Sequence, residues 1–500
     1  MKFAVLASAL IFTAGAKDQP QWGQAWSRNM VSEEKHLPSQ FDPKTGENIR
    51  WRARLGTESH GSPIIADGRV YVGTNNGEPR STKHKGDRGV LMCFDERDGN
   101  FLWQLVVPKR AEDPYLDWPK SGIASEATVD SGGVYVVSNR GEVLCLDPRG
   151  LANGNDGSYQ EESKHQTPAG TETIPADKSD ADILWLFDMV SSAGIWTHDG
   201  AHSSILVDGD FLYVNTGTGV DNTHRKIRTP EAPSLIVLDK RTGQLLARER
   251  EEMAPNVFHA TWSSPSKGTI GGQEFIVFAG GNGIVYGFEP LKKPPGQGTV
   301  ATLKKLWQFD PDPNGPKEQV HRFTTNRREG PSNIYGMPVI VDGSLYIAGG
   351  GDLWWGKNEA WLKRLEVSRP NGAYEAVEHW THLLERHTMS TPAVIGDLVF
   401  IADCAKNLYC LDRNSGKPYW THELKGEIWA SPFVADGKVF LGSRRSDFWV
   451  FAAAAEKKVI HSSDLGAPIS ATAAAANGTL FISTMTEIFA VSRSGIQGFP

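Results

Sequence analysis

Short apolar runs separated by turn residues recur along most of the chain. In residues 62–74, SPIIADGRVYVGT, two β-branched runs meet at an Asp-Gly pair, which is typical of a tight β-hairpin. Clear copies of this unit occupy residues 205–216, 337–349, 391–403 and 431–443. The pattern therefore predicts pairs of short antiparallel strands along the chain.

A second unit follows each of these hairpins. In residues 408–420, LYCLDRNSGKPYW, an apolar run leads into a D-x-x-S-G turn, and a tryptophan closes the segment. Residues 91–103, 143–150 and 235–247 are close copies. Weaker copies begin at Val285, Leu362, Phe448 and Ile488, which brings the number to eight. Two hairpins per repeat, with a shortest period of about 40 residues, predict the four-stranded blade of a β-propeller.

The eighth copy ends near Gly495 without a fourth strand, and a matching segment stands near the other end of the chain. Residues 48–56, NIRWRARLG, carry Trp51 where a fourth strand would have it. We therefore expect an all-β, eight-bladed β-propeller of four-stranded antiparallel blades, with the ring closed by an N-terminal strand. The expected organisation is a signal peptide over 1–16, an N-terminal extension over 17–47 and the propeller over 48–500.

Large rings recur near the start of the predicted fourth strands, where they are expected to pack between neighbouring blades. The tryptophans at this position are Trp51, Trp103, Trp185, Trp307, Trp380 and Trp420. Ala247 and His461 take the position in blades three and seven.

Three of the four cysteines share one third-strand position. Cys93, Cys145 and Cys410 stand where other copies have glycine, alanine or valine, so we expect small buried side chains there. Cys404 and Cys410 flank a predicted turn, and the sequence leaves open whether they form a disulfide.

Composition and the first residues indicate an exported protein. A net charge of -7 gives no concentrated basic face, so no nucleic-acid partner is expected. Met1-Lys2, an apolar run and the sequence Ala14-Gly15-Ala16 form the pattern of a signal peptide cleaved after Ala16. No lipobox cysteine follows, and no apolar run is long enough to span a membrane. We expect a monomer that is periplasmic or secreted.

The two repeated units, as in TPAVIGDLVFIAD followed by LYCLDRNSGKPYW, resemble the PQQ-like β-propeller repeat. This repeat is shared by quinoprotein dehydrogenases and by the BamB-type propeller of the outer-membrane assembly machine. The likeness covers residues 48–495. Residues 21–56 and 349–365 look more like bacterial, exported "PQQ-binding-like" propellers of uncertain function.

The resemblance does not bring a cofactor with it. Quinoprotein dehydrogenases typically hold the quinone between a tryptophan and a disulfide of adjacent cysteines, above a calcium ion. This chain has no adjacent cysteines, and the calcium ligands cannot be placed on its residues. No cofactor is assured, and PQQ with calcium stays an alternative. BamB-type proteins usually carry the lipobox cysteine that is missing here.

Functional residues are expected where loops interrupt the repeat. The first and third strands of a blade run in the same direction. The loop leading into the first strand and the loop between the second and third strands therefore lie on one face, and most long loops fall there. Polar and aromatic side chains gather in the leading loops: His60, Glu126, His198, His202, His259, Trp262, Tyr335, His387 and Trp429. We expect them to converge on the mouth of the central channel, where they suit a flat or sugar-like ligand.

One loop on the same face is distinctive. GGGDLWWGKNEAW, residues 349–361, carries Asp352, Trp354, Trp355 and Lys357, which we interpret as part of a ligand or partner surface. Alternatively, the tryptophans plug the channel or pack on blade six. No H-x-H or HExxH spacing supports a metal site, so none is expected.

These observations favour a non-catalytic binding or scaffold module, with an unknown small molecule or an envelope protein at the loop-rich face. The alternative is a PQQ-dependent oxidoreductase that acts on an alcohol or sugar, with histidine or glutamate as base. A polysaccharide-directed enzyme that uses Glu126 and a histidine is a third hypothesis. The sequence identifies no catalytic residue.

Overall fold

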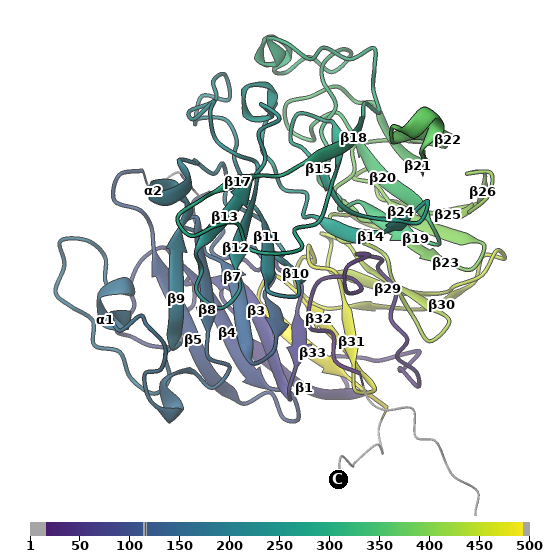
Figure 1. Cartoon of the computed structure of the whole chain (residues 1–500). Helices are drawn as coiled ribbons and strands as arrows, with labels where there is room; N and C mark the ends of the chain where they lie inside the picture. The colour runs from purple at the N-terminus through teal and green to yellow at the C-terminus, as the bar shows by residue number, and fades with distance from the viewer. Residues whose placement is uncertain (1–16, 114–115, 117, 494–500) are drawn as a thin grey trace, which may run out of the picture.

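Eight antiparallel sheets of the predicted kind make up the protein (Figure 1). The computed structural model describes residues 17–113, 116 and 118–493. The signal peptide expected over 1–16 lies outside these residues. The eight-bladed, all-β fold is confirmed.

Blades one to four follow the chain order predicted from the repeats. Blade one contains β2 (Ile64–Ala66), β3 (Arg69–Asn75), β4 (Arg88–Asp95) and β5 (Phe101–Pro108). Blade two contains β6 (Thr128–Asp130), β7 (Gly133–Val137), β8 (Glu142–Leu146) and β9 (Ile183–Asp188). Blade three contains β10 (Leu206–Asp208), β11 (Phe211–Asn215), β12 (Leu235–Asp239) and β13 (Leu245–Arg248). Blade four contains β14 (Ser266–Ile270), β15 (Gln273–Ala279), β16 (Val285–Phe288) and β18 (Lys305–Phe309).

Blades five to eight complete the ring. Blade five contains β19 (Val339–Val341), β20 (Ser344–Gly350), β21 (Ala360–Ser368) and β22 (Glu375–Leu384). Blade six contains β23 (Ala393–Ile395), β24 (Leu398–Ala402), β25 (Asn407–Asp412) and β26 (Pro418–Glu423). Blade seven contains β27 (Phe433–Ala435), β28 (Lys438–Gly442), β29 (Asp447–Ala452) and β30 (Val459–Asp464). Blade eight contains β31 (Ala474–Ala476), β32 (Thr479–Ser483), β33 (Glu487–Val491) and, from the N-terminal side, β1 (Ile49–Arg54).

The predicted ring closure is present. β1 pairs antiparallel with β33, and Trp51 lies opposite Ala490. This pairing supplies the fourth strand that the last repeat lacks, so blade eight is built from both ends of the propeller sequence.

Irregular elements lie in the insertions. Two short α-helices, α1 (Glu162–His165) and α2 (Met189–Ala193), flank β9. β17 (Ala301–Thr302) lies between β16 and β18 in the chain and pairs parallel with β13, which adds a fifth strand to the sheet of blade three. The 3-10 turns are η1 (Gly150–Asn153), η2 (Ala254–Asn256), η3 (Val320–Phe323) and η4 (Pro370–Gly372).

The tryptophans of the fourth strands pack between blades as predicted, and all six are buried. Five of them also donate the indole N–H to a carbonyl oxygen in the next blade, at or beside the turn after its third strand. These pairs are Trp51–Glu96 at 2.8 Å, Trp103–Pro148 at 2.8 Å, Trp185–Lys240 at 3.2 Å, Trp380–Arg413 at 3.0 Å and Trp420–Ala454 at 3.0 Å. Each of these rings therefore contributes apolar burial and one directed bond between neighbouring blades.

The packing of these tryptophans also explains why the repeated turn contains a glycine. Gly416 has a φ of +68°, and a Cβ on it would lie 2.5 Å from the Trp380 ring of the preceding blade. A side chain there would strain the backbone and displace the tryptophan. The third-strand cysteines are buried as expected, and all four cysteines are free, so no Cys404–Cys410 disulfide forms.

The N-terminal extension runs along the inner strands of the ring, which the sequence did not predict. It hydrogen-bonds to a residue of every blade. The partners are Ile65, Val129, Val207, Lys267, Ile340, Val394, Val434 and Gly478. Because first strands line the channel of a propeller, the extension lies within the channel below the mouth.

Arg28 anchors the extension. It is fully buried and donates to the carbonyl oxygens of Ser204 and Pro265 at 2.9 Å each. Burial lowers the pKa of this guanidinium to about 9, against the opposing attraction of the Glu126 carboxylate. Among the described residues, no helix combines the length and apolar character needed to cross a membrane.

Candidate ligand-binding site

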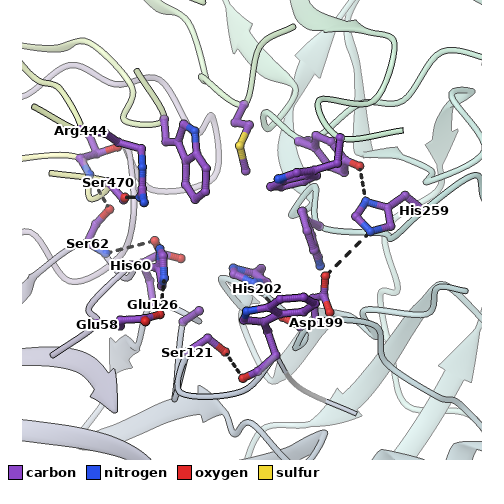
Figure 2. Close-up of a pocket in the computed structure, with 18 of the residues that line it drawn as sticks. Glu58, His60, Ser62, Ser121, Glu126, Asp199, His202, His259, Arg444 and Ser470 are labelled. Atoms are coloured by element: carbon purple, nitrogen blue, oxygen red, sulfur yellow. Dashed lines mark hydrogen bonds and ion pairs between the residues drawn. The ribbon is translucent and has the colours of Figure 1, made fainter. Parts of the chain in front are cut away.

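A cavity of about 440 Å³ opens at the mouth of the channel, above the N-terminal extension. Loops of all eight blades contribute to its wall, and Trp22 of the extension contributes as well. Figure 2 shows Glu58, His60, Glu126 and Arg444 on one side of an open space, with Asp199 and His259 on the other. Each blade contributes a loop of different sequence to the cavity, so the side chains that line it differ from blade to blade.

Most of the residues singled out from the sequence meet in this cavity. Seven of the nine channel-mouth candidates line it: His60, Glu126, His202, His259, Trp262, Tyr335 and Trp429. Trp354 and Trp355 of the distinctive loop also line it. The geometry of the propeller thus brings together residues that are up to 369 positions apart in the chain.

Four predicted residues lie outside the cavity wall: His198, which is buried in the histidine cluster, His387, Lys357 and Asp352. His387 is buried, and its Nε2 lies 3.0 Å from the carbonyl oxygen of Lys357. The ammonium of Lys357 is itself buried and lies 2.8 Å from an oxygen of Asp312. Asp352 is fully buried behind His259. These side chains support the wall, because their polar groups bond within the protein.

The structure adds cavity residues that the sequence reasoning missed. These are Trp22, Glu58, Ser62, Trp118, Ser121, Ala124, Asp199, His224, Met389, Arg444, Ser470 and Thr472. His224 lies in the loop between β11 and β12, the second and third strands of blade three. The adjacency of His198 and Asp199 in a leading loop was the one signal in the sequence that pointed to Asp199.

Aromatic rings form much of the cavity wall. The Trp262 ring lies 4.9 Å from Tyr335 and 5.8 Å from Trp354, measured between centroids, and Trp354 meets Trp429 edge to face at 5.9 Å. The guanidinium of Arg444 lies over the Trp429 ring at 3.9 Å. These contacts hold several indoles in fixed orientations around the space.

An acidic group lies on the side of the cavity opposite His259. Glu126 is buried, and its Oε1 accepts the backbone N–H of Ser62 at 3.2 Å. Burial raises the pKa of Glu126 to about 7, although the bond from Ser62 and the charge of Arg28 act in the other direction. Near neutral pH this carboxyl group therefore exists in both protonation states.

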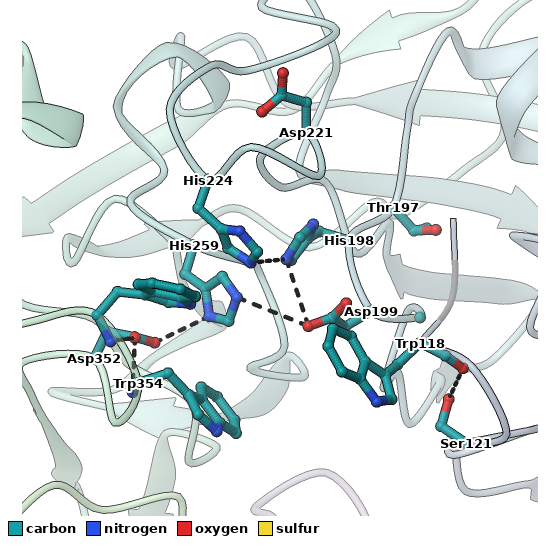
Figure 3. A network of polar contacts seen from close by, with 12 residues as sticks. Trp118, Ser121, Thr197, His198, Asp199, Asp221, His224, His259, Asp352 and Trp354 are labelled. Atoms are coloured by element: carbon teal, nitrogen blue, oxygen red, sulfur yellow. Dashed lines mark hydrogen bonds and ion pairs between the residues drawn. The ribbon is translucent and has the colours of Figure 1, made fainter. Parts of the chain in front are cut away.

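The histidine side is a connected polar cluster (Figure 3). His198 Nε2 lies 3.1 Å from His224 Nε2 and 3.4 Å from Asp199 Oδ2. His259 Nε2 lies 3.8 Å from the same Asp199 oxygen, while His259 Nδ1 lies 3.0 Å from Asp352 Oδ2.

Asp352 orders this side of the cavity. Its Oδ1 accepts the backbone N–H groups of Trp354 and Trp355 at 3.0 and 2.6 Å, and its Oδ2 accepts the Tyr335 hydroxyl. Burial alone would raise the pKa of Asp352, but His259 and these donors hold it below its ordinary value. A charged Asp352 therefore fixes the loop that carries both tryptophans.

The pKa values of the imidazoles are shifted in different directions. Burial lowers the pKa of His198 to about 2 and that of His202 to about 4, and in each case a neighbouring histidine lowers it further. Burial also lowers the pKa of His224. For His259, the Asp352 carboxylate outweighs burial and raises the pKa.

Asp199, His202 and His224 have positive φ values of 54°, 40° and 56°, backbone strain that is common in functional loops.

Comparison with known proteins agrees with the repeat and the fold. The family model described as outer membrane protein assembly factor BamB matches residues 27–150 and 348–495, more than half of the chain. A search of curated proteins gives no match.

Solved structures with the same architecture share little sequence with this chain. BamB from Moraxella catarrhalis is 10% identical, with a TM-score of 0.53, over 90% of this chain and 98% of that one. A europium-containing methanol dehydrogenase is 11% identical, with a TM-score of 0.47, over 95% and 98% of the two chains. Quinohemoprotein alcohol dehydrogenase from Comamonas testosteroni is 13% identical, with a TM-score of 0.45, over 97% and 81%. The likeness to BamB supports the fold, and the family match over more than half of the chain places the chain in the BamB-type family of PQQ-like β-propellers.

Proposed function

We propose that this chain is an exported binding propeller whose mouth receives a neutral, ring-shaped ligand of the size of a simple sugar, without chemical conversion. The observation that carries the proposal is the cavity of about 440 Å³, with indole faces around it and hydrogen-bonding groups on two sides. Small-molecule sites typically enclose about 300–1,000 Å³ and combine apolar walls with a few placed polar groups.

The wall chemistry suits a sugar. One face of a sugar ring exposes C–H groups that pack on an indole such as Trp262 or Trp429. Its hydroxyl groups both donate and accept hydrogen bonds, so they can bond to the carboxyl groups of Glu58 and Glu126 and to neutral imidazoles such as His202.

The charges of the wall favour a neutral ligand. Three acidic side chains, Glu58, Glu126 and Asp199, line the cavity, and Arg444 is the single lysine or arginine among the described lining residues. A polyanionic ligand would meet repulsion from at least the ionised carboxylates.

The alternative is a PQQ-dependent oxidoreductase, and the residues fit that cofactor poorly. The quinone carries three carboxylates, yet only Arg444 would offset them. The four cysteines are free and none are adjacent, so the disulfide platform of the standard quinoproteins is missing. The polar cluster consists mainly of imidazoles, whereas calcium prefers six to eight oxygen ligands.

The same loop-rich face is where an envelope protein would dock in a scaffold role. The exposed indole of Trp118, at 56% of its full accessibility, lies on that face. Export is supported by the charged, apolar and A-x-A pattern of residues 1–16.

Calorimetry on the purified mature chain tests the binding proposal. Glucose, mannose, galactose, N-acetylglucosamine and their disaccharides are titrated singly, followed by PQQ with and without calcium. We expect saturable 1:1 binding of at least one sugar, lost in Trp262→Ala, and an unchanged sugar recovered after long incubation. Stoichiometric binding of PQQ with no sugar binding would overturn the proposal in favour of the oxidoreductase, and no binding of any sugar would overturn it as well.

A further inference from the structure

Three imidazoles and a carboxylate converge at one edge of the cavity from three separate loops. His198 and Asp199 come from the loop that leads into blade three, His224 from the loop between its second and third strands, and His259 from the loop that leads into blade four. One ligand atom of each lies within 4.8 Å of all the others. Figure 3 shows the four side chains directed toward a common space.

The spacing of these atoms matches that of ligands around one small cation. Two ligands about 2.0–2.1 Å from an ion in a tetrahedral arrangement are about 3.3 Å apart. The separations here are 3.1 Å for His198–His224, 3.4 Å for His198–Asp199 and 3.8 Å for His259–Asp199. Small rotations of these side chains would therefore bring all four atoms to one ion.

A buried nitrogen in this cluster has no hydrogen-bond partner among the described residues. His259 is 2% exposed, and its Nε2 makes no hydrogen bond within the described protein, although it points at the cluster. A buried polar atom without a partner is costly. A hydrogen-bonded cluster would leave this nitrogen unsatisfied, whereas a cation would use its lone pair.

The opposite nitrogen of the same ring is held as in known metal sites. His259 Nδ1 bonds to the Asp352 carboxylate at 3.0 Å, which leaves Nε2 free to act as a ligand. His198 and His224 interact with the backbones of Val220 and Asn222. Metal-binding histidines usually donate the other ring N–H to a carboxylate or carbonyl, which fixes the tautomer and the orientation.

We propose that His198, His224, His259 and Asp199 form a binding site for one divalent transition-metal ion of the zinc class. Three nitrogen ligands and one oxygen suit Zn²⁺ or Co²⁺, whereas Ca²⁺ and Mg²⁺ prefer six or more oxygens. Asp352 is a positioning residue, because it acts on the ion through His259.

The site goes beyond sugar binding and does not depend on it. The ion would tie the loops of blades three and four together. Because His224, His259 and Asp199 also line the cavity, the ion would stand at the cavity wall as a Lewis acid within reach of a bound molecule.

Cobalt titration of the metal-stripped full-length mature protein tests this proposal. The protein is treated with a chelator, dialysed and titrated with Co²⁺ in the absence of sugar, and visible absorption reports the coordination of the ion. We expect an intense d–d band that saturates at one Co²⁺ per chain and is displaced by Zn²⁺. His259→Ala and His198→Ala should abolish the band, and Asp352→Asn should weaken cobalt binding by about 10- to 100-fold.

A matched control removes an imidazole outside the cluster. His422→Ala, on β26, should bind cobalt as the unaltered protein does, and circular dichroism checks that each variant keeps its sheets. No saturable band at one equivalent, or an unchanged band in His259→Ala, would overturn the proposal. Sugar binding is measured separately on the metal-free protein, so the two proposals fail independently.

Discussion

Tryptophans do two different jobs in this protein. At the blade boundaries, rings such as Trp103 are buried, occupy a repeated position and donate to a carbonyl of the next blade. At the mouth, rings such as Trp429 are half-buried and face a cavity, at a leading-loop position that Trp262 shares but where other blades carry different side chains. The indole of Trp429 makes no hydrogen bond within the described residues. The repeat therefore marks residues that stabilise the ring, and departures from it mark residues that are free to bind something else.

The largest loss of stability is expected when a tryptophan at a blade boundary is replaced. Trp103 is 1% exposed, so Trp103→Ala leaves a large cavity between blades one and two and removes the bond to Pro148. We expect a loss of about 3–5 kcal/mol in the free energy of unfolding, measured in urea. A loss below about 1 kcal/mol would break the comparison, since boundary and mouth rings would then be alike.

In contrast to the loss of stability expected for Trp103→Ala, substitution of an acidic residue of the mouth should increase the stability of the protein. Burial raises the pKa of Glu126 from an ordinary 4.5 to about 7, so the folded protein binds a proton more tightly than the unfolded chain. Its contribution to stability is therefore most favourable below about pH 4.5 and declines as the pH rises toward about 7. Glu126→Gln should remove this decline and stabilise the protein above pH 7 by on the order of 3 kcal/mol.

Thermal unfolding between pH 4 and pH 8 measures this difference. The exposed Glu231→Gln serves as the matched control, because it removes one carboxylate without changing the mouth. An identical pH profile for Glu126→Gln and the unaltered protein would show that the mouth does not reduce stability in this way.

A smaller loss is expected from the glycine that faces a boundary ring. Gly416→Ala adds strain at a φ of +68° and a clash with Trp380, for which we expect a loss of about 1–3 kcal/mol in unfolding free energy. Gly437→Ala is the control, because Gly437 has a φ of +69° with open space around its Cβ position. The difference between the two variants isolates the contact with the tryptophan, and equal losses would leave only backbone strain.

The smallest change in stability should come from a mouth ring. Trp429→Ala removes a half-buried indole and its contact with Arg444, so we expect a loss of less than about 1 kcal/mol. Sugar affinity should nevertheless fall at least tenfold by calorimetry. Trp26→Ala, which removes an exposed indole of the N-terminal extension, should keep full affinity. Equal affinity in both variants would contradict a ligand role for the mouth tryptophans.

The sequence predicted the architecture well because the repeat encodes it. Turn residues, the tryptophan position and the N-terminal match to a fourth strand were sufficient to place eight blades and the closing strand. The leading loops also predicted seven of the cavity residues, since propeller geometry brings these loops to one mouth, but twelve other lining residues were missed. The inner path of the N-terminal extension escaped prediction, because it contains no repeat and bonds largely through its backbone.

The histidine cluster illustrates the limit of reading spacing along the chain. His198, His224 and His259 are separated by 26 and 35 positions, and their proximity depends on the paths of two adjacent loops. The expectation of no metal rested on the lack of closely spaced ligands. It stays a prediction that the cobalt titration decides, but its premise does not apply where ligands come from different blades.

The closing strand and the buried extension also set an order of events during synthesis. β1 is made before any complete blade, yet its partner β33 lies more than 430 residues later, and Arg28 bonds to residues more than 170 positions away. Contacts of such separation form slowly because a long loop must close first. The first segment of the propeller to leave the ribosome is therefore among the last to form its native contacts. The ring stays open until the final blade has been made.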